Sequence, residues 1–203
     1  MHLNYDWITH QKQYITPLIE SFKPKTMLEI GSFEGASTVY FLEEMTKYND
    51  VQFISLDTWA GSEEHTGIID MSETERLFDS NVQEFLENHK TFSPRKIQFV
   101  KYKTTSLRGM CDLIYNNSKF DCIYIDGSHE AADVFVDAAL AFRLCNVNGL
   151  LIFDDYEWAW NLHENEYKRP KIAIDAFEKC FGDKIAAIAT GGTYQKYYQK
   201  ISE

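Results

Sequence analysis

The chain has 203 residues, enough for one domain with a large core, and its 44% hydrophobic share is that of a globular protein. The formal net charge of -11 argues against a nucleic-acid partner, because binding a phosphate backbone requires a basic surface. No apolar run reaches the length of a membrane span, and the N-terminus lacks the apolar core of a signal peptide. We therefore expect a cytoplasmic protein without nucleic-acid or membrane partners, and the sequence leaves open whether it is a monomer or a homo-oligomer.

The four cysteines are widely spaced and contain no CxxC pair, which argues against a zinc or redox site. Three of them lie in apolar segments and are expected to be buried free thiols. Both features fit a reducing cytoplasm.

Segments with strand-like spacing alternate along the chain with segments of helical spacing. Seven strands are predicted, over residues 26–30, 51–56, 96–102, a segment from Phe120 to Asp126, a segment ending at Asp154, 184–190 and 193–201. Helices are predicted over residues 5–22, 37–48, 72–89, 105–116, 171–180 and between the fourth and fifth strands.

This alternation predicts an α/β fold with a doubly wound, Rossmann-like sheet of seven mainly parallel strands. Gly191 and Gly192 predict a tight turn that makes the last two strands an antiparallel hairpin. We expect residues 1–203 to form a single domain that begins with a helical segment over 1–24. The long loops over 58–72 and 156–169 are candidate lids.

Three aspartates end two of the predicted parallel strands: Asp126 ends the fourth, and Asp154 with Asp155 ends the fifth. Parallel strands place their carboxyl ends at one edge of the sheet, about 4.8 Å apart when they are neighbours, so these carboxylates can converge on one cation. Oxygen ligands favour Mg²⁺, Ca²⁺ or Mn²⁺. Because successive strand residues point to opposite faces, Asp154 and Asp155 converge only if the chain turns there. Otherwise one aspartate caps a helix and another faces solvent.

The turn after the first strand carries Gly31 and Gly35 in the order G-x-x-x-G. Such glycines let the backbone approach a ligand, with the N–H groups of the next helix facing it. Phe33 stands where the dinucleotide-binding fingerprint requires glycine, which argues against a pyrophosphate ligand. The alternative is an ordinary strand-to-helix turn with Ser37 as the helix N-cap.

Two carboxylates flank this turn. Glu29 would repel a phosphate but accept a hydrogen bond from an ammonium group, and Asp57 is placed to accept hydrogen bonds from ribose hydroxyls. Together they predict a cofactor that contains a ribose but no phosphate.

The run LEIGSFEGAS, residues 28–37, resembles the cofactor loop of class I S-adenosylmethionine-dependent methyltransferases, in the form found in the catechol-type and caffeoyl-CoA-type O-methyltransferases. The resemblance extends over nearly the whole chain, including the order of strands and helices. The segments DTWAGSEEH and DGSH are closer still to the macrolide-sugar O-methyltransferase branch.

The resemblance implies S-adenosylmethionine as cofactor and assigns roles to several residues. The methionine part would contact Glu29, Gly31, Ser32, Gly35 and Ser37. Asp57 would hold the ribose, Thr105 or Ser106 would lie near the adenine, and Trp59 would cover the adenine or pack in the lid. Thr58 and Asp126 complete the predicted cofactor-binding residues. Asp126, Asp154 and Asp155 occupy the positions of the family's metal ligands, for Mg²⁺ or another divalent cation, although the last is often asparagine.

His129 is the candidate general base. It is expected in the first turn of the helix that follows Asp126, with Ser128 as N-cap, where the helix N-terminus would keep the imidazole neutral and able to accept a proton. The alternative is a partly exposed histidine at a helix start. Catechol-type enzymes have lysine at the matching place, so histidine favours a sugar or aliphatic hydroxyl as acceptor.

The acceptor is expected to be a small molecule with a hydroxyl of sugar, phenol or natural-product type. Tyr156, Trp158 and Trp160 form its apolar wall or simply pack, and His65 contacts it or lies at the surface. A nicotinamide-dependent oxidoreductase, which shares the fold and Asp57, is one alternative function. A hydroxylase-like enzyme and a non-catalytic cofactor-binding module are the others.

Overall fold

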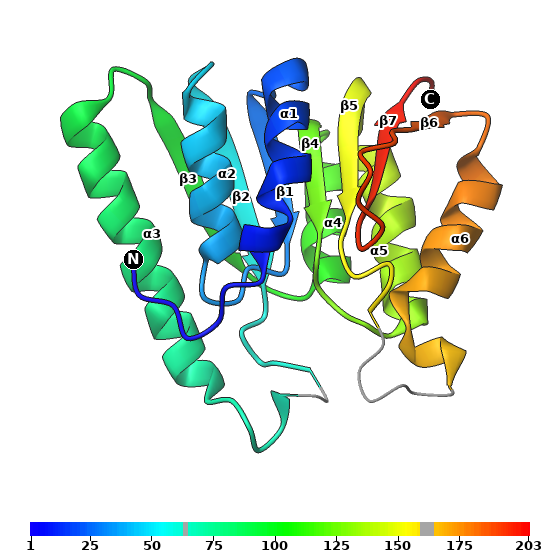
Figure 1. Cartoon of the computed structure of the whole chain (residues 1–203), viewed down its shortest axis with the longest axis horizontal. Coiled ribbons are helices and arrows are strands. Elements are labelled where there is room, and N and C mark those ends of the chain that lie inside the picture. Colours follow the sequence, from blue (N-terminus) through cyan, green and yellow to red (C-terminus); the bar gives the residue numbers. More distant parts are fainter. Residues whose placement is uncertain (63–64, 159–164) are drawn as a thin grey trace.

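The computed structural model describes residues 1–62, 65–158 and 165–203 and shows a sheet between two layers of helices (Figure 1). The sheet has seven strands in the order β3-β2-β1-β4-β5-β7-β6. The strands are β1 Thr26–Ile30, β2 Val51–Asp57, β3 Ile97–Lys103, β4 Phe120–Ile125, β5 Cys145–Phe153, β6 Ile185–Ala187 and β7 Lys196–Lys200. The predicted α/β fold, with its mainly parallel sheet and antiparallel end, is confirmed.

The helices are α1 Lys12–Phe22, α2 Ala36–Thr46, α3 Met71–Phe92, α4 Ser106–Tyr115, α5 Ala131–Leu144 and α6 Pro170–Phe181, with short 3-10 turns η1 Ile8–His10 and η4 Glu166–Lys168. The predicted helix over 5–22 is therefore two pieces, and the chain leaves α1 through Lys23, which has a left-handed backbone with φ 46°. No helix of the described ranges is both long and apolar enough to span a membrane.

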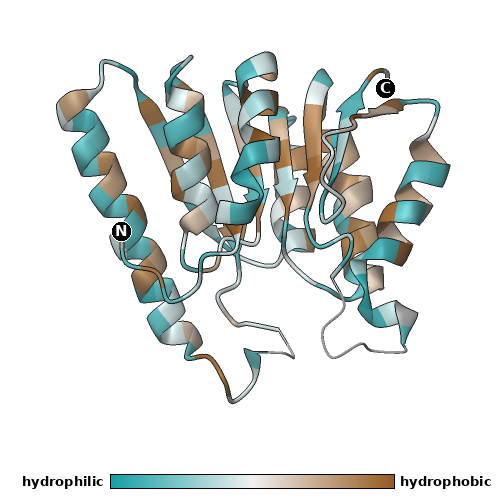
Figure 2. Cartoon of the chain, in the orientation of Figure 1, coloured by the Kyte–Doolittle hydropathy of each residue, from teal (hydrophilic) through white to brown (hydrophobic). Residues whose placement is uncertain are grey.

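Alternation along the strands divides the core into two layers. Leu28, Ile123 and Leu151 pack with α4, α5 and α6, whereas Met27 and Cys122 pack with α1 and α2 on the other face. Figure 2 shows the result, with hydrophobic strands inside and helices whose hydrophilic residues face outward. The strands β1, β4 and β5 are covered on both faces, which explains why their sequences read as continuous apolar runs.

The last strand corrects one prediction. β7 pairs antiparallel with both β5 and β6, as expected of the C-terminal hairpin. However, Gly191 and Gly192 do not form a tight two-residue turn, because β6 ends at Ala187 and β7 begins only at Lys196. The longer connection carries Tyr194 and Gln195 back to the carboxyl ends of the parallel strands.

The burial of the thiols also differs from expectation. Cys122 and Cys145 are buried and free, but Cys111 and Cys180 are exposed. Both exposed residues lie on amphipathic helices, Cys111 on α4 and Cys180 on α6. An apolar neighbourhood in sequence does not decide which side of a helix a residue occupies.

The sheet reverses its strand order between β1 and β4. The chain runs from β1 outward through β2 to β3, then returns to β4 on the other side of β1 and continues to β5. The carboxyl ends of these strands form the lower edge of the molecule in Figure 1. In open α/β sheets such a reversal leaves a crevice where ligands bind, so a ligand site is expected at this edge.

Candidate active site

Gly31 begins the loop at this reversal and lies directly against the end of β4. Its backbone has φ +82°, and a Cβ added to it would lie 1.9 Å from the carbonyl oxygen of Asp126. The amide of Asp126 donates to the carbonyl of Ile30 at 2.8 Å, and the amide of Gly31 donates to the carbonyl of Leu56 at 2.9 Å. Only glycine allows both the conformation and this approach.

Glu29 supports the same loop from inside the protein. Its side chain is fully buried and accepts hydrogen bonds from four hydroxyl groups: Ser32 at 2.8 Å, Ser37 at 2.7 Å, Thr38 at 2.5 Å and Ser55 at 2.7 Å. Burial raises the pKa of Glu29 in spite of these donors. Both carboxylate oxygens of Glu29 therefore have protein partners. The predicted contact of Glu29 with an ammonium group stays a prediction.

Asp57 fixes the other side of the loop. One of its carboxylate oxygens accepts from the amides of Ser32 at 2.8 Å and Phe33 at 3.1 Å, and the other accepts from the amide of Trp59 at 2.7 Å. These hydrogen bonds fix the conformation of the turn. The helix α2 begins at Ala36, after Gly35, whose φ is +85°. The alternative that Ser37 caps this helix is wrong, because Ser37 lies inside α2 and donates to Glu29.

The N-terminal residues form a strap across this loop. Glu34, which is 2% exposed, accepts from the backbone amide of Asn4 at 2.8 Å and from that of Tyr5 at 3.2 Å. The rings of Tyr5 and Trp7 lie 5.9 and 5.1 Å from that of Phe33. Strap and loop are thus held together, a contact between distant segments that local sequence patterns did not reveal.

The other predicted residues of the cofactor side have structural partners. Trp59 is 4% exposed, packs in the core 4.7 Å from Phe78 and donates from its indole nitrogen to the carbonyl of Phe33. Thr58 accepts from the amide of Ala60 at 3.1 Å. At the start of α4, Thr105 is the N-cap, and the Ser106 hydroxyl hydrogen-bonds Asp137 of α5.

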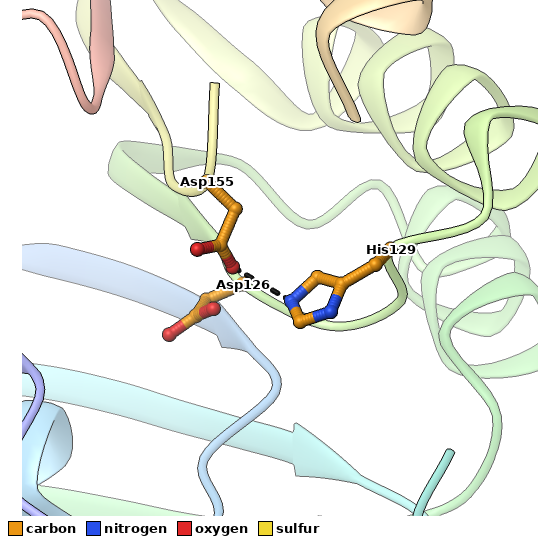
Figure 3. A group of neighbouring side chains, drawn as sticks. All are labelled: Asp126, His129 and Asp155. Atoms are coloured by element: carbon orange, nitrogen blue, oxygen red, sulfur yellow. Dashed lines mark hydrogen bonds and ion pairs between the residues drawn. The ribbon is translucent and has the colours of Figure 1, made fainter. Parts of the chain in front are cut away.

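Asp126, His129 and Asp155 come together on the β4 and β5 side of the reversal (Figure 3). One ligand atom from each lies within 4.8 Å of the others, as a metal ion would require. The Nε2 atom of His129 lies 2.7 Å from a carboxylate oxygen of Asp155. Asp155 has a left-handed backbone with φ 59°, so the chain does turn between the two adjacent aspartates.

The predicted convergence of three aspartates on one cation stays a prediction. Asp154 lies beside this group, because the hydroxyl of Tyr124 contacts both Asp126, at 3.1 Å, and Asp154. One of its oxygens accepts from the hydroxyl of Tyr124 and the other from the amide of Asp155 at 2.8 Å. The turn directs Asp155 toward His129 and leaves Asp154 on the Tyr124 side. Burial and the neighbouring carboxylates raise the pKa of both Asp126 and Asp154 above the ordinary range.

His129 precedes the helix instead of lying in its first turn. α5 begins at Ala131 with Glu130 as N-cap, and the Ser128 hydroxyl donates to Asp133 at 3.0 Å. The predicted N-cap role of Ser128 is therefore wrong, and the argument from the helix N-terminus does not apply to His129. Its ring instead lies 4.1 Å from that of Trp158 and beside Asp155.

Residues 28–156 match the model of a family described as a methyltransferase domain. The chain belongs to this methyltransferase family. The family predicted from the cofactor-loop motif is thereby confirmed, and the matched residues include both the glycine loop and the aspartates that end β4 and β5. No curated protein matches the chain.

Solved structures with the same fold include O-methyltransferases. One from Bacillus cereus, in complex with SAH, is 16% identical with a TM-score of 0.65, and the match covers 98% of this chain and 84% of that chain. The O-methyltransferase TomG from Streptomyces achromogenes, in complex with SAM, is 14% identical with a TM-score of 0.64, and the match covers 96% of this chain and 80% of that one. At these identities the likeness shows a shared fold.

The residues predicted to contact an acceptor separate into three groups. Trp158 lies against His129, as described. Tyr156 packs away from that histidine: it is 9% exposed, donates to Asp175 of α6 at 2.8 Å and has the Lys171 ammonium 3.7 Å from its ring centre. His65 lies 5.5 Å from the ring of Phe33 and lines a cavity of about 410 Å³ with Ala60 and Met71. Trp160 lies outside the described residues.

We predict that Gly31→Ala removes the site while Gly191→Ala does not. Alanine at position 31 would place its Cβ inside the backbone of Asp126 and force the loop away from β4. Gly191 has a similar φ of +84°, but a Cβ added there would have no atom within 4 Å. The strain of a positive φ, about 1 kcal/mol, is common to both variants. Thermal unfolding and calorimetric titration with S-adenosylhomocysteine measure the difference. Equal losses in the two variants would contradict this account.

We also predict a pH-dependent gain in stability for Asp137→Asn. Burial raises the pKa of Asp137 from 3.8 to about 7, so the folded state binds a proton there that the unfolded state has released. This stabilisation is complete below the unfolded pKa and is lost as pH rises toward 7, by roughly 4 kcal/mol at most. The stability of Asp137→Asn relative to the wild type should therefore increase between pH 4.5 and 7.5, measured by urea unfolding. The exposed Asp183→Asn serves as control, and a pH-independent difference would exclude this role for Asp137.

Proposed function

We propose that the protein is an S-adenosylmethionine-dependent O-methyltransferase that acts on a small-molecule hydroxyl with the help of a divalent cation. The observation that carries the proposal is the position of the glycine loop against the end of β4, beside Asp126, His129 and Asp155. A methyl donor bound on this loop would lie next to two carboxylates and an imidazole, side chains of the kind that bind cations and protons. The methyltransferase family and the O-methyltransferases that share the fold support it.

The loop of residues 31–35 would bind the methionine part of the cofactor through its backbone. Asp57 is part of this site because it holds the loop amides and retains lone pairs at the rim for ribose hydroxyls. Ser32 and Ser37 are oriented by Glu29. Thr58 follows β2 and Thr105 and Ser106 begin α4, where they would lie near the adenine. When bound, the cofactor supplies an electrophilic methyl group on a sulfonium.

The carboxylates fit a divalent cation. Asp126 and Asp155 are oxygen ligands of the type that Mg²⁺ and Mn²⁺ prefer, and Asp154 lies beside them on the hydroxyl of Tyr124. Such a cation, when bound, lowers the pKa of a coordinated hydroxyl. Burial and, after it, the negative charges of Asp154 and Asp155 raise the pKa of Asp126, and a cation would relieve the repulsion among these carboxylates.

His129 would act as the general base. Its contact with Asp155 orients the imidazole, and Trp158 covers one face of the ring, so the histidine is held at the edge where an acceptor would lie. The proton would pass from the acceptor hydroxyl to a ring nitrogen of His129. The chain would accelerate the reaction chiefly by holding donor and acceptor in line.

The nicotinamide alternative is not favoured. Phe33 occupies the position where a pyrophosphate-binding turn requires glycine. Its backbone has a left-handed φ of 46°, so the turn forms here with phenylalanine in place of glycine. The family match is to methyltransferases. The absence of any fluorescence change on titrating NADH would agree with this conclusion.

We predict that S-adenosylhomocysteine at about 100 times its Kd stabilises the protein by roughly 2.7 kcal/mol, or about 5–10 °C in melting temperature. NADH at the same concentration should give no shift. The scan is made with and without Mg²⁺, and no shift with S-adenosylhomocysteine under any condition would overturn the proposed function.

We predict that His129→Asn lowers kcat for methyl transfer by about 10² to 10⁴, the usual contribution of a general base. Cofactor affinity should not change, because His129 lies on the β4 and β5 side of the site. The exposed His10→Asn is the matched control. A kcat within threefold of the wild type would remove His129 from the mechanism, although the methyltransferase assignment would stand.

A further inference from the structure

Tyr124 carries a polar hydroxyl at a buried position of β4, where a purely apolar side chain would be usual. It is 1% exposed, its ring lies 5.1 Å from that of Phe41, and its strand neighbours Ile123 and Ile125 are purely apolar. Its hydroxyl reaches beyond the end of β4 and donates toward two carboxylates, Asp126 at 3.1 Å and Asp154 more closely. A phenol has one proton, so these two carboxylates share a single donor.

The register of the sheet places Tyr124 beside another buried polar residue. Tyr124 of β4 lies directly opposite Glu29 of β1, so the two buried polar side chains are neighbours on one face of the sheet. Glu29 holds the hydroxyl groups of the glycine loop, and Tyr124 holds the carboxylates on the adjoining side. Together they form a polar layer beneath the edge at which the cofactor and cation would bind.

Tyr124 also fixes which oxygens face the edge. It occupies one oxygen of Asp126 and one of Asp154, and the amide of Asp155 occupies the second oxygen of Asp154. Tyr194, from the connection before β7, hydrogen-bonds Asp155, and Gln195 lies beside Asp154. Each carboxylate of the group thus has a protein partner that limits its rotation.

We propose that Tyr124 is a positioning residue for the divalent cation of the proposed function: its hydroxyl, which bridges Asp126 and Asp154, holds Asp126 so that its second oxygen is presented at the edge of the sheet. The inference rests on the proposed metal site and adds a residue that touches neither cation nor substrate. Partners of this kind orient carboxylate ligands, and their loss commonly weakens metal binding by about 10 to 100 times.

The test is the affinity of the metal-free protein for Mn²⁺ alone, measured by electron paramagnetic resonance or calorimetry without cofactor. Tyr124→Phe keeps the packing against Phe41 and removes only the hydroxyl. It should weaken Mn²⁺ binding by about 10 to 100 times and leave S-adenosylhomocysteine affinity unchanged. Tyr198→Phe is the matched control, because Tyr198 of β7 is also 1% exposed in the same sheet but donates to Glu178 of α6 at 3.0 Å.

The outcomes separate this inference from the function on which it rests. Mn²⁺ binding by the wild type that is lost in Asp126→Asn supports the metal site, and no binding by the wild type overturns both proposals. Normal wild-type binding with Tyr124→Phe within threefold of it overturns the role of Tyr124 alone. If Tyr124→Phe does not fold, Tyr124→Phe is compared with its Tyr124 parent in an Asp154→Asn background. That background removes the negative charge that would lose its hydrogen-bond donor in Tyr124→Phe. There the phenol still holds Asp126, and a change of less than threefold would overturn the inference.

Discussion

The contact between Gly31 and the backbone of Asp126 is the constraint on which the rest of the site depends. It joins the ends of β1 and β4 at the point where the strand order reverses, with no room for a side chain between them. The loop that follows β1 is therefore fixed relative to the aspartates that follow β4 and β5. A donor bound on the loop and an acceptor bound near the aspartates would meet at a distance set by backbone packing, which is stiffer than any contact between long side chains.

Buried polar groups, not only the apolar core, determine the shape of this edge. Glu29 is fully buried with four hydroxyl donors, and Asp57 binds three backbone amides. Leaving such groups without partners inside a protein costs more free energy than a single bond contributes, so each network favours one loop conformation over its alternatives. Residues that family resemblance assigns to ligand contacts thus also hold the loop in place.

Among the described residues, the carboxylates at the ends of β4 and β5 have fewer hydrogen-bond donors around them than Glu29. Asp126 and Asp154 have raised pKa values because burial and mutual repulsion disfavour their charges. Tyr124 donates toward both of these carboxylates, and His129 and Tyr194 contact Asp155, but none of the three brings a permanent positive charge. A bound cation would relieve this repulsion, which is the physical basis of the proposed metal dependence.

The sequence by itself determined the fold and the edge that carries the site, because apolar periodicity, glycine positions and strand-terminal aspartates are local signals. It located the seven strands to within a few residues and identified Glu29, Gly31, Asp57, Asp126, His129 and Asp155 as residues at that edge. Only the tertiary structure decided their orientations: that Asp154 lies on Tyr124 while Asp155 lies on His129, that Tyr156 packs under α6, and that Trp59 enters the core. These depend on backbone turns of positive φ and on partners from distant strands. The same separation in sequence concealed Tyr124, which reads as one more buried strand residue until its hydroxyl is placed beside two carboxylates.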